Sequence, residues 1–355
     1  MLTNGEQCFA GFSYGQFGKK FAAKVPGDGP LRPILAGVHV SLCSFVIRLF
    51  AFVSLESDIE GNRIVSIGPA AQVKIPTGAT VIDTSGRTMM PGLIEAHAHL
   101  NILGHGDYNR WYPWITKNGL IERAMEISAM QLLRAGVTSA IDLGGPLKES
   151  LSVRDRINRG EIPGPRMSMS GPWVTRALGN YPPEMNMMQK LVDTPEEAAR
   201  AVDDLAKAGV DVIKAYVNLT PAHYRAIVDA AHRHQKRVHA HVYAEQDVRN
   251  ALEAGVDVLQ HVGSGGTAPP YSPELIRDVV NAGRPVVTTI AHRSWVFPDT
   301  VQFPERLQEP QLKTDFGPVI WEEVQNSFQN WHTLPYFART DREIFFAPRP
   351  KFGVE

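Results

Sequence analysis

Four histidines stand at the ends of expected β-strands, at spacings that suit a metal site. His97 and His99 are two residues apart, and on a strand residues i and i+2 point to the same face, so both imidazoles can reach one metal ion. His241 and His261 end two later strands and add two more imidazoles. A His-x-His pair alone fits a polar strand end equally well, but four histidines at one face favour a site for zinc or a related divalent cation.

Lys214 ends an apolar strand among these histidines. Such a lysine must either extend its amine to solvent or lose its charge, because burial and nearby cations lower its pKa. A neutral amine can react with carbon dioxide to give an anionic carbamate, whose two oxygens can bridge two metal ions. An ordinary solvated or ion-paired lysine is the alternative interpretation.

A recurring junction indicates how these residues are positioned. A helical stretch ends in Ala-Gly and a β-branched strand follows, at Ala135-Gly136, Ala208-Gly209, Ala254-Gly255 and Ala282-Gly283. Helix starts with an N-cap residue followed by proline occur at Thr194-Pro195, Thr220-Pro221 and Ser272-Pro273. The pattern predicts an α/β fold whose strands end at one face, where α/β barrels carry their chemistry.

Seven strands can be identified beyond Pro91, and each ends in a residue of chemical interest. In chain order these are His97 with His99, Asp142, Ser170, Lys214, His241, His261 and His292. Side chains near these ends are candidates for substrate contacts, although each is as consistent with a structural or solvent-facing role: His105, Asp142, Ser170, Arg176, Tyr216 and His292.

Composition excludes several classes of protein. The 355 residues allow two domains at roughly 150 residues each, or one barrel of about 250 residues with an appendage. A net charge of −1 provides no general attraction to nucleic acid or an acidic membrane. Cys8 and Cys43 are the only cysteines, which excludes a disulfide framework, a four-cysteine zinc site and a C-x-x-C redox pair. Any metal must therefore be held by His, Asp, Glu or Lys.

The first 57 residues form a poorly defined N-terminal segment. Residues 1–33 show neither helical nor strand periodicity and are interpreted as loop or tail. The apolar run at residues 37–55 resembles a membrane anchor, but Arg48 within it would cost about 2.5–3.5 kcal/mol on insertion scales. Strands of a small β domain are the other interpretation of this run. We interpret the protein as soluble and cytoplasmic or of unassigned compartment, with membrane attachment or export through the apolar run as the alternative.

Residues 58–90 are expected to form a small β domain, with strands at 63–67 and at Thr80–Asp83. Pro91-Gly92 then ends this pattern, and residues 91–355 form the expected barrel.

Residues 90–99, with the sequence MPGLIEAHAH, resemble the P-G-[LF]-[IV]-D-x-H-x-H opening of the amidohydrolase superfamily. The similarity is greatest to its imidazolonepropionase-like and Xaa-Pro dipeptidase-like branch. It continues over roughly residues 58 to 290, through Ala135 to Asp142, Val212 to Lys214, and His239 to His261.

This resemblance implies a (β/α)8 TIM-type barrel with two divalent metal ions, zinc being the expected element. His97 and His99 would bind one ion, carboxylated Lys214 would bridge, and His241 and His261 would bind the second. Lys214 and His261 are the expected catalytic residues. His239 competes with His241 as a ligand from the same strand; the family spacing favours His241, with His239 one layer deeper in the barrel.

Two features depart from the family pattern. Glu95 replaces the usual Asp before His-x-His. The eighth strand with its Gly-Thr-Asp is missing, because Thr314-Asp315 follows polar residues and Asp341 is preceded by no strand. The barrel is therefore expected to be truncated after seven strands, with a long insertion from about residue 293 to 350.

The sequence predicts a metal-dependent hydrolase of C–N amide bonds that acts through a metal-bridging hydroxide. The substrate would be a small molecule: an N-acyl amino acid, a dipeptide such as Xaa-Pro, or a cyclic amide. Nucleic acid and membrane partners are not expected, and a homo-oligomer is compatible with the sequence. The alternative is a truncated, catalytically impaired homologue that binds metal without turnover. A non-catalytic α/β binding module would leave the aligned histidines unexplained.

Overall fold

The computed structural model describes residues 20–24, 55–61, 63–84, 87–103, 108–176, 181–262, 271–289 and 308–329. The chain divides into two compact units. One is Tyr14–Pro91, and the other is Gly92–Glu355 together with Met1–Ser13.

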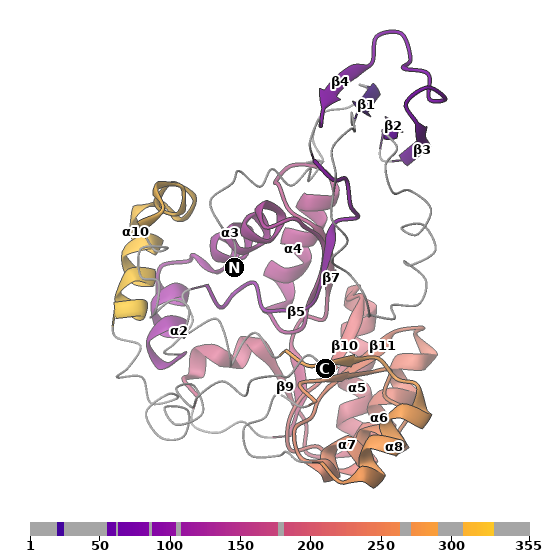
Figure 1. Ribbon diagram of the computed structural model, residues 1–355. Helices are drawn as coiled ribbons and strands as arrows, with labels where there is room; N and C mark the ends of the chain where they lie inside the picture. The colour runs from indigo at the N-terminus through magenta and orange to yellow at the C-terminus, as the bar shows by residue number, and fades with distance from the viewer. Residues whose placement is uncertain are drawn as a thin grey trace. The chain divides into compact units, whose positions relative to one another are not determined.

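The smaller unit contains one four-stranded sheet in the order β3-β2-β1-β4 (Figure 1). Its strands are β1 (Lys20–Lys24), β2 (Leu55–Glu60), β3 (Arg63–Pro69) and β4 (Thr80–Asp83). The strands predicted within β3 and at β4 are confirmed. The prediction of loop or tail for residues 1–33 is wrong at β1, which pairs antiparallel with β2 and parallel with β4. Both partners are distant in sequence, so the local composition of residues 20–24 gave no indication of this strand.

Of the apolar run at residues 37–55, only Leu55 lies within the described residues, where it begins β2. Within the described part of the chain, none of the helices has both the length and the apolar character that a membrane crossing requires.

The larger unit alternates strands and helices, as the Ala-Gly junctions predicted. Its strands are β5 (Leu93–Ala98), β6 (Val137–Asp142), β7 (Arg166–Met169), β8 (Trp173–Thr175), β9 (Gln189–Leu191), β10 (Val212–Ala215), β11 (Arg237–His241), β12 (Val258–Gln260) and β13 (Val286–Val287). Its helices are α2 (Tyr108–Lys117), α3 (Ile121–Arg134), α4 (Leu147–Asn158), α5 (Pro195–Ala208), α6 (Pro221–Arg233), α7 (Glu245–Glu253), α8 (Pro273–Ala282) and α10 (Pro310–Gln329), with a 3-10 helix η1 at Pro183–Met188.

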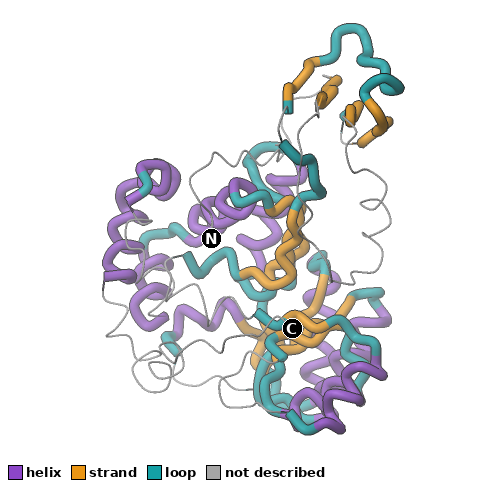
Figure 2. Tube along the Cα trace, in the orientation of Figure 1, coloured by secondary structure: helices purple, strands orange, loops and turns teal. Residues whose placement is uncertain are grey.

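The strands of this unit lie in two parallel sheets, ordered β5-β6-β7 and β13-β12-β11-β10-β8-β9. Helices α5 to α8 lie together beside the six-stranded sheet (Figure 2). Apolar side chains from both layers form the core between them, including Ile213 and Leu259 from the strands and Leu205 and Ile227 from the helices, all fully buried. The fold is thus established as α/β with parallel strands. The described strands do not join into one closed sheet.

The helix boundaries follow the predicted capping signals. Thr194 caps α5 with its side-chain oxygen, which accepts a hydrogen bond from the backbone N–H of Glu197 at 3.2 Å, while Glu197 completes a capping box. Gly209 ends α5 in the left-handed region at φ 95°, which glycine tolerates without a steric penalty. This cap returns the chain into β10, and so places Lys214.

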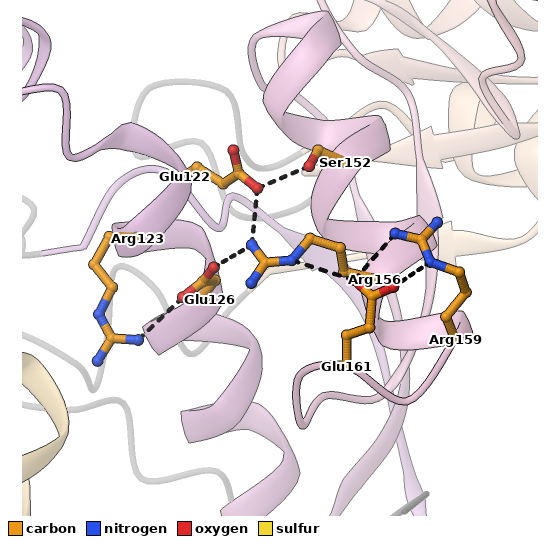
Figure 3. A network of polar contacts seen from close by, with 7 residues as sticks. All are labelled: Glu122, Arg123, Glu126, Ser152, Arg156, Arg159 and Glu161. Atoms are coloured by element: carbon orange, nitrogen blue, oxygen red, sulfur yellow. Dashed lines mark hydrogen bonds and ion pairs between the residues drawn. The ribbon is translucent and has the colours of Figure 1, made fainter.

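A network of ion pairs joins α3 to α4 (Figure 3). The Arg156 guanidinium donates to Glu122 at 2.9 Å and also to Glu126, both on α3. Ser152 on α4 donates to the same Glu122 carboxylate at 2.7 Å. These contacts fix the two helices that flank β6 relative to each other.

The segment containing Thr314-Asp315 lies in α10. The buried Asp315 carboxylate pairs with Arg134 and accepts a hydrogen bond from Gln131 at 2.7 Å, so it is a helix-packing residue. This confirms that Asp315 does not end a strand. Asp341 lies outside the described residues, as does most of the expected insertion at 293–350.

Candidate active site at the carboxyl ends of the strands

The predicted metal-site residues stand at or just after the carboxyl ends of parallel strands from both sheets of the larger unit. His97 is the penultimate residue of β5 and His99 follows that strand, while Lys214 is the penultimate residue of β10. His241 ends β11 and His261 follows β12. Because the carboxyl ends of parallel strands meet at one edge, these side chains share one region of the unit.

The four predicted histidine ligands form a continuous cluster of rings. The Nε2 atoms of His97 and His99 are 3.1 Å apart. The ring centroid of His261 lies 4.3 Å from that of His97 and 4.4 Å from that of His241. Burial is the main cause that lowers the pKa of His97 and of His261 well below the usual value, so both rings are neutral at physiological pH.

Lys214 is fully buried beside this cluster. Its Nζ has no hydrogen-bond partner among the described residues. Burial lowers the pKa of this amine well below its ordinary value, because the charged form cannot be hydrated there. A neutral, unpartnered amine among neutral imidazoles is a nucleophile rather than a structural cation.

Gln260, which sequence reasoning did not single out, connects two of the histidines. Its Oε1 lies 2.7 Å from His97 Nδ1, and its Nε2 lies 2.9 Å from His239 Nδ1. Gln260 is fully buried, and His239 is 4% exposed with its pKa lowered to about 4 by burial. A polar residue directly before His261 in an apolar strand was the available signal in the sequence.

His261 has an unusual backbone conformation, with φ at 71°. Its N–H donates to the carbonyl of Val287 at 2.7 Å, and its Nδ1 is hydrogen-bonded to Thr289 Oγ1 at 2.9 Å. Left-handed backbone is costly for residues other than glycine and persists only where surrounding contacts enforce it, which is common at functional sites. The Thr289 contact also orients the His261 ring.

Aromatic side chains border the histidine cluster. Tyr216, a predicted substrate contact, stacks on Trp173 with ring centroids 4.4 Å apart, and it makes an edge-to-face contact with His241 with centroids 4.6 Å apart. The ring centroid of Tyr243 lies 4.6 Å from that of His241 and 5.2 Å from that of His261. Sequence reasoning missed Trp173 and Tyr243, because strand periodicity does not distinguish a site aromatic from a core aromatic.

Trp173 is held firmly in this position. Its indole N–H donates to the carbonyl of Leu143 at 2.7 Å. A Cβ atom at Gly144 would lie 1.8 Å from the same indole nitrogen, so the indole fits only against glycine.

Two of the other predicted substrate contacts, Asp142 and Ser170, have structural partners. The Asp142 carboxylate accepts hydrogen bonds from the backbone N–H groups of Leu100 and Gly144, at 2.8 and 3.0 Å. Ser170 is buried and donates to the carbonyl of Gly171, and Arg176 is exposed. His105 and His292 lie outside the described residues.

Glu95 accepts a hydrogen bond from the backbone N–H of His97 at 2.8 Å. This places the carboxylate beside the His-x-His pair, where the family pattern has aspartate.

The described residues contain no group of three or more His, Cys, Asp or Glu side chains in a metal-binding arrangement.

Comparison with other proteins gives the family context. A model of the amidohydrolase family matches residues 88–308, which is more than half of the chain. Ochratoxinase from Aspergillus niger is 27% identical over 281 residues, covering 67% of this chain and 52% of its own length. The chain therefore spans about half the length of that relative.

Solved structures agree with this assignment. A putative prolidase from Bifidobacterium longum is 27% identical, with a TM-score of 0.54 over 81% of this chain and 66% of its own. A prolidase solved with N-methylphosphonate-L-proline shares the fold, at 20% identity and a TM-score of 0.61 over 89% of this chain and 74% of its own. These matches confirm the resemblance to the Xaa-Pro dipeptidase-like branch. By the family model and by these relatives, the chain belongs to the amidohydrolase family.

Proposed function

We propose that this chain is a hydrolase that cleaves a C–N amide bond at the carboxyl ends of its strands, with two divalent metal ions, zinc being the expected element. The observation that carries the proposal is the cluster of His97, His99, His241 and His261 around the buried, unpartnered amine of Lys214. We further propose that the seven parallel strands β5, β6, β7 and β10 to β13 are staves of a (β/α)8 barrel, which the prolidase fold supports.

The types of donor atom in this cluster suit divalent cations. Zinc accepts imidazole nitrogen at about 2.0–2.1 Å, which separates two tetrahedral ligands by about 3.3 Å, close to the 3.1 Å between His97 Nε2 and His99 Nε2. Burial keeps the His97 and His261 rings neutral, and the neutral ring is the form that offers a lone pair. His241 and His261 would serve the second ion.

Lys214 would contribute as a carbamate. Its neutral Nζ attacks carbon dioxide, a C–N bond forms, one proton is released, and the product carries one negative charge on two oxygens. The single negative charge of the carbamate would neutralise part of the charge of two cations. Its formation would also remove the buried amine whose hydrogen bonds are unmet.

Bound cations would supply a nucleophilic hydroxide from water and polarise the amide carbonyl. The chain's own residues would arrange the substrate. The stacked rings of Trp173 and Tyr216 offer an apolar wall beside His241 and exclude water from that side. Because two similar structures are named prolidases, and one was solved with N-methylphosphonate-L-proline, we expect Xaa-Pro dipeptides as the first substrate class, with N-acyl amino acids and cyclic amides as further classes.

The test combines metal content with hydrolysis. The purified full chain is loaded with zinc, its metal content is measured by mass spectrometry, and a panel of N-acyl amino acids, dipeptides and lactams is assayed. We expect about two ions per chain and turnover on at least one class. Absence of bound metal would refute the proposal. Bound metal without hydrolysis would instead identify a metal-binding homologue without turnover, an alternative favoured by the helical, ion-paired position of Asp315.

Substitutions separate the ligands. His241→Ala should lower the zinc content, whereas His239→Ala should leave it unchanged. His232→Ala is the matched control, because His232 lies on α6 and pairs with Asp257 on the outside of the unit. Lys214→Ala should lose metal and regain it when a short carboxylate such as acetate is added. If Lys214→Ala keeps the metal content of the wild type, and added acetate does not change that content, the carbamate is excluded.

A further inference from the structure

Gln260 lies between two histidines on different strands. It is the last residue of β12, and its side chain is fully buried. Its amide oxygen faces His97 Nδ1 on β5 at 2.7 Å, and its amide nitrogen faces His239 Nδ1 on β11 at 2.9 Å. One amide group therefore connects strands of both parallel sheets.

An amide enforces opposite protonation on the two rings that it joins. Its oxygen only accepts hydrogen bonds and its nitrogen only donates them. His97 Nδ1 must therefore carry a proton, and His239 Nδ1 must not. The lone pair of His97 then lies on Nε2, the atom that faces His99 Nε2. The reversed amide would place the proton on His97 Nε2 and block that atom as a ligand.

We propose that Gln260 is a positioning residue that holds His97 in the tautomer with its proton on Nδ1, and that it thereby prepares Nε2 for a metal ion; this rests on the proposed function. The N–H of the same amide donates to His239 Nδ1 and leaves the His239 proton on Nε2. Gln260 therefore selects His97 as a ligand and excludes His239. Histidine ligands commonly donate their second N–H to an oxygen that fixes the ring, and here a buried amide takes that role.

The choice of substitution follows from this geometry. Gln260→Met has similar length and no hydrogen-bonding oxygen, so His97 would lose its tautomer preference. Gln260→Glu retains an acceptor for His97 Nδ1–H, but its second oxygen can only accept, so His239 must move its proton to Nδ1. The two variants therefore predict different outcomes at the two rings.

The first measurement is made on metal-free protein with 15N-labelled histidine, in which nitrogen shifts report the tautomer of each ring. The signals of His97 and His239 are assigned from their absence in His97→Gln and His239→Gln. We expect an Nδ1–H signal for His97 in the wild type and in Gln260→Glu, and its loss in Gln260→Met. His239 should be protonated on Nε2 in the wild type and on Nδ1 in Gln260→Glu.

The second measurement is zinc affinity by competition with a chelator. Loss of such an outer partner typically weakens metal binding about 10–100-fold, and we expect this range for Gln260→Met. Gln260→Glu should recover most of the affinity, which a packing defect would not explain. Gln246→Met is the control, since Gln246 is exposed on α7, where its side chain donates a hydrogen bond to Asn250.

Several outcomes would overturn the inference. His97 protonated on Nε2 in the wild type would refute it, as would wild-type zinc affinity in Gln260→Met. If Gln260→Met does not fold, the tautomer of His239 in Gln260→Glu is the deciding measurement. A His239 ring that is still protonated on Nε2 in that variant would contradict the proposal. Failure of the proposed function would give a different result. A wild-type protein that binds no zinc would contradict the proposed function, but an Nδ1–H signal for His97 in that protein would still support the effect of Gln260 on the tautomer.

Discussion

The buried amine of Lys214 should destabilise the metal-free protein, so Lys214→Met should stabilise it. The folded environment lowers the pKa of Lys214, and the amine has no partner among the described residues. Methionine has nearly the same length and shape but carries neither a charge nor a hydrogen-bonding nitrogen. The substitution therefore removes an unfavourable group and leaves the surrounding packing intact.

The expected gain can be worked from the position of Lys214. An unfolded lysine has a pKa of about 10.4, so keeping the amine neutral at pH 7.5 costs about 4 kcal/mol, at 1.36 kcal/mol per unit. The unmet hydrogen bonds of the neutral amine cost a further 1–3 kcal/mol or so. Since the folded structure can relax around the amine, we expect Lys214→Met to raise the free energy of unfolding by about 2–5 kcal/mol.

The pH dependence identifies the cause. Between the lowered folded pKa and about 10.4, the unfolded chain binds one more proton than the folded chain, so wild-type stability rises with pH by about 1.4 kcal/mol per unit. Lys214→Met lacks this slope. Its advantage should therefore shrink steadily from pH 7.5 to pH 9.5, and near the unfolded pKa only the part due to the unmet hydrogen bonds should remain.

The assay is urea unfolding of chelator-treated protein in carbon-dioxide-free buffer, followed by tryptophan fluorescence. Excluding carbon dioxide prevents carbamate formation at Lys214. Lys207→Met is the matched control, because Lys207 is exposed in the last turn of α5 and should show little change. A Lys214→Met protein that is less stable than wild type at pH 7.5, or whose advantage is independent of pH, would refute this reasoning.

Two further predictions concern residues outside the histidine cluster. Burial raises the pKa of Asp142 to about 7. The stability that this carboxyl contributes is therefore present below its unfolded pKa of about 3.9 and is lost as the pH rises to 7. In urea unfolding from pH 4.5 to 7, the free energy of unfolding should decline less for Asp142→Asn than for the wild type. Arg156→Met removes the ion pairs to Glu122 and Glu126. We expect the free energy of unfolding to fall by about 1 kcal/mol or less, and this difference should disappear in 1 M NaCl. A loss of stability that does not depend on salt would indicate a packing effect instead.

The parts of the fold that could be predicted are those with local signals. Thr194-Pro195 begins α5 and Gly209 ends it, because capping and left-handed backbone depend on residues adjacent in the chain. Strand β1 could not be predicted, since Lys20–Lys24 has strand partners more than 30 residues away and no alternation of its own. Its pairing is a property of the sheet rather than of the segment.

The site divides in the same way. His97, Lys214 and His241 could be predicted as neighbours because each stands at the end of a recognisable strand, and parallel strands end at one edge. Asp142 and Ser170 stand at equivalent strand ends, yet their side chains are used by nearby backbone groups. Strand position therefore locates the region but does not distinguish a ligand from a structural polar residue.

The choice between His239 and His241 shows what does distinguish them. Both lie on β11 two residues apart, so their side chains share a face and periodicity cannot separate them. His239 faces Gln260, which occupies its Nδ1, whereas the His241 ring lies among Tyr216, Tyr243 and His261. Under the proposed role of Gln260, the partner across the strands leaves His239 without a lone pair for a metal ion, which periodicity along β11 does not show. Measuring the tautomers of His239 and His97 in the same metal-free sample therefore tests the ligand assignment before any metal is added.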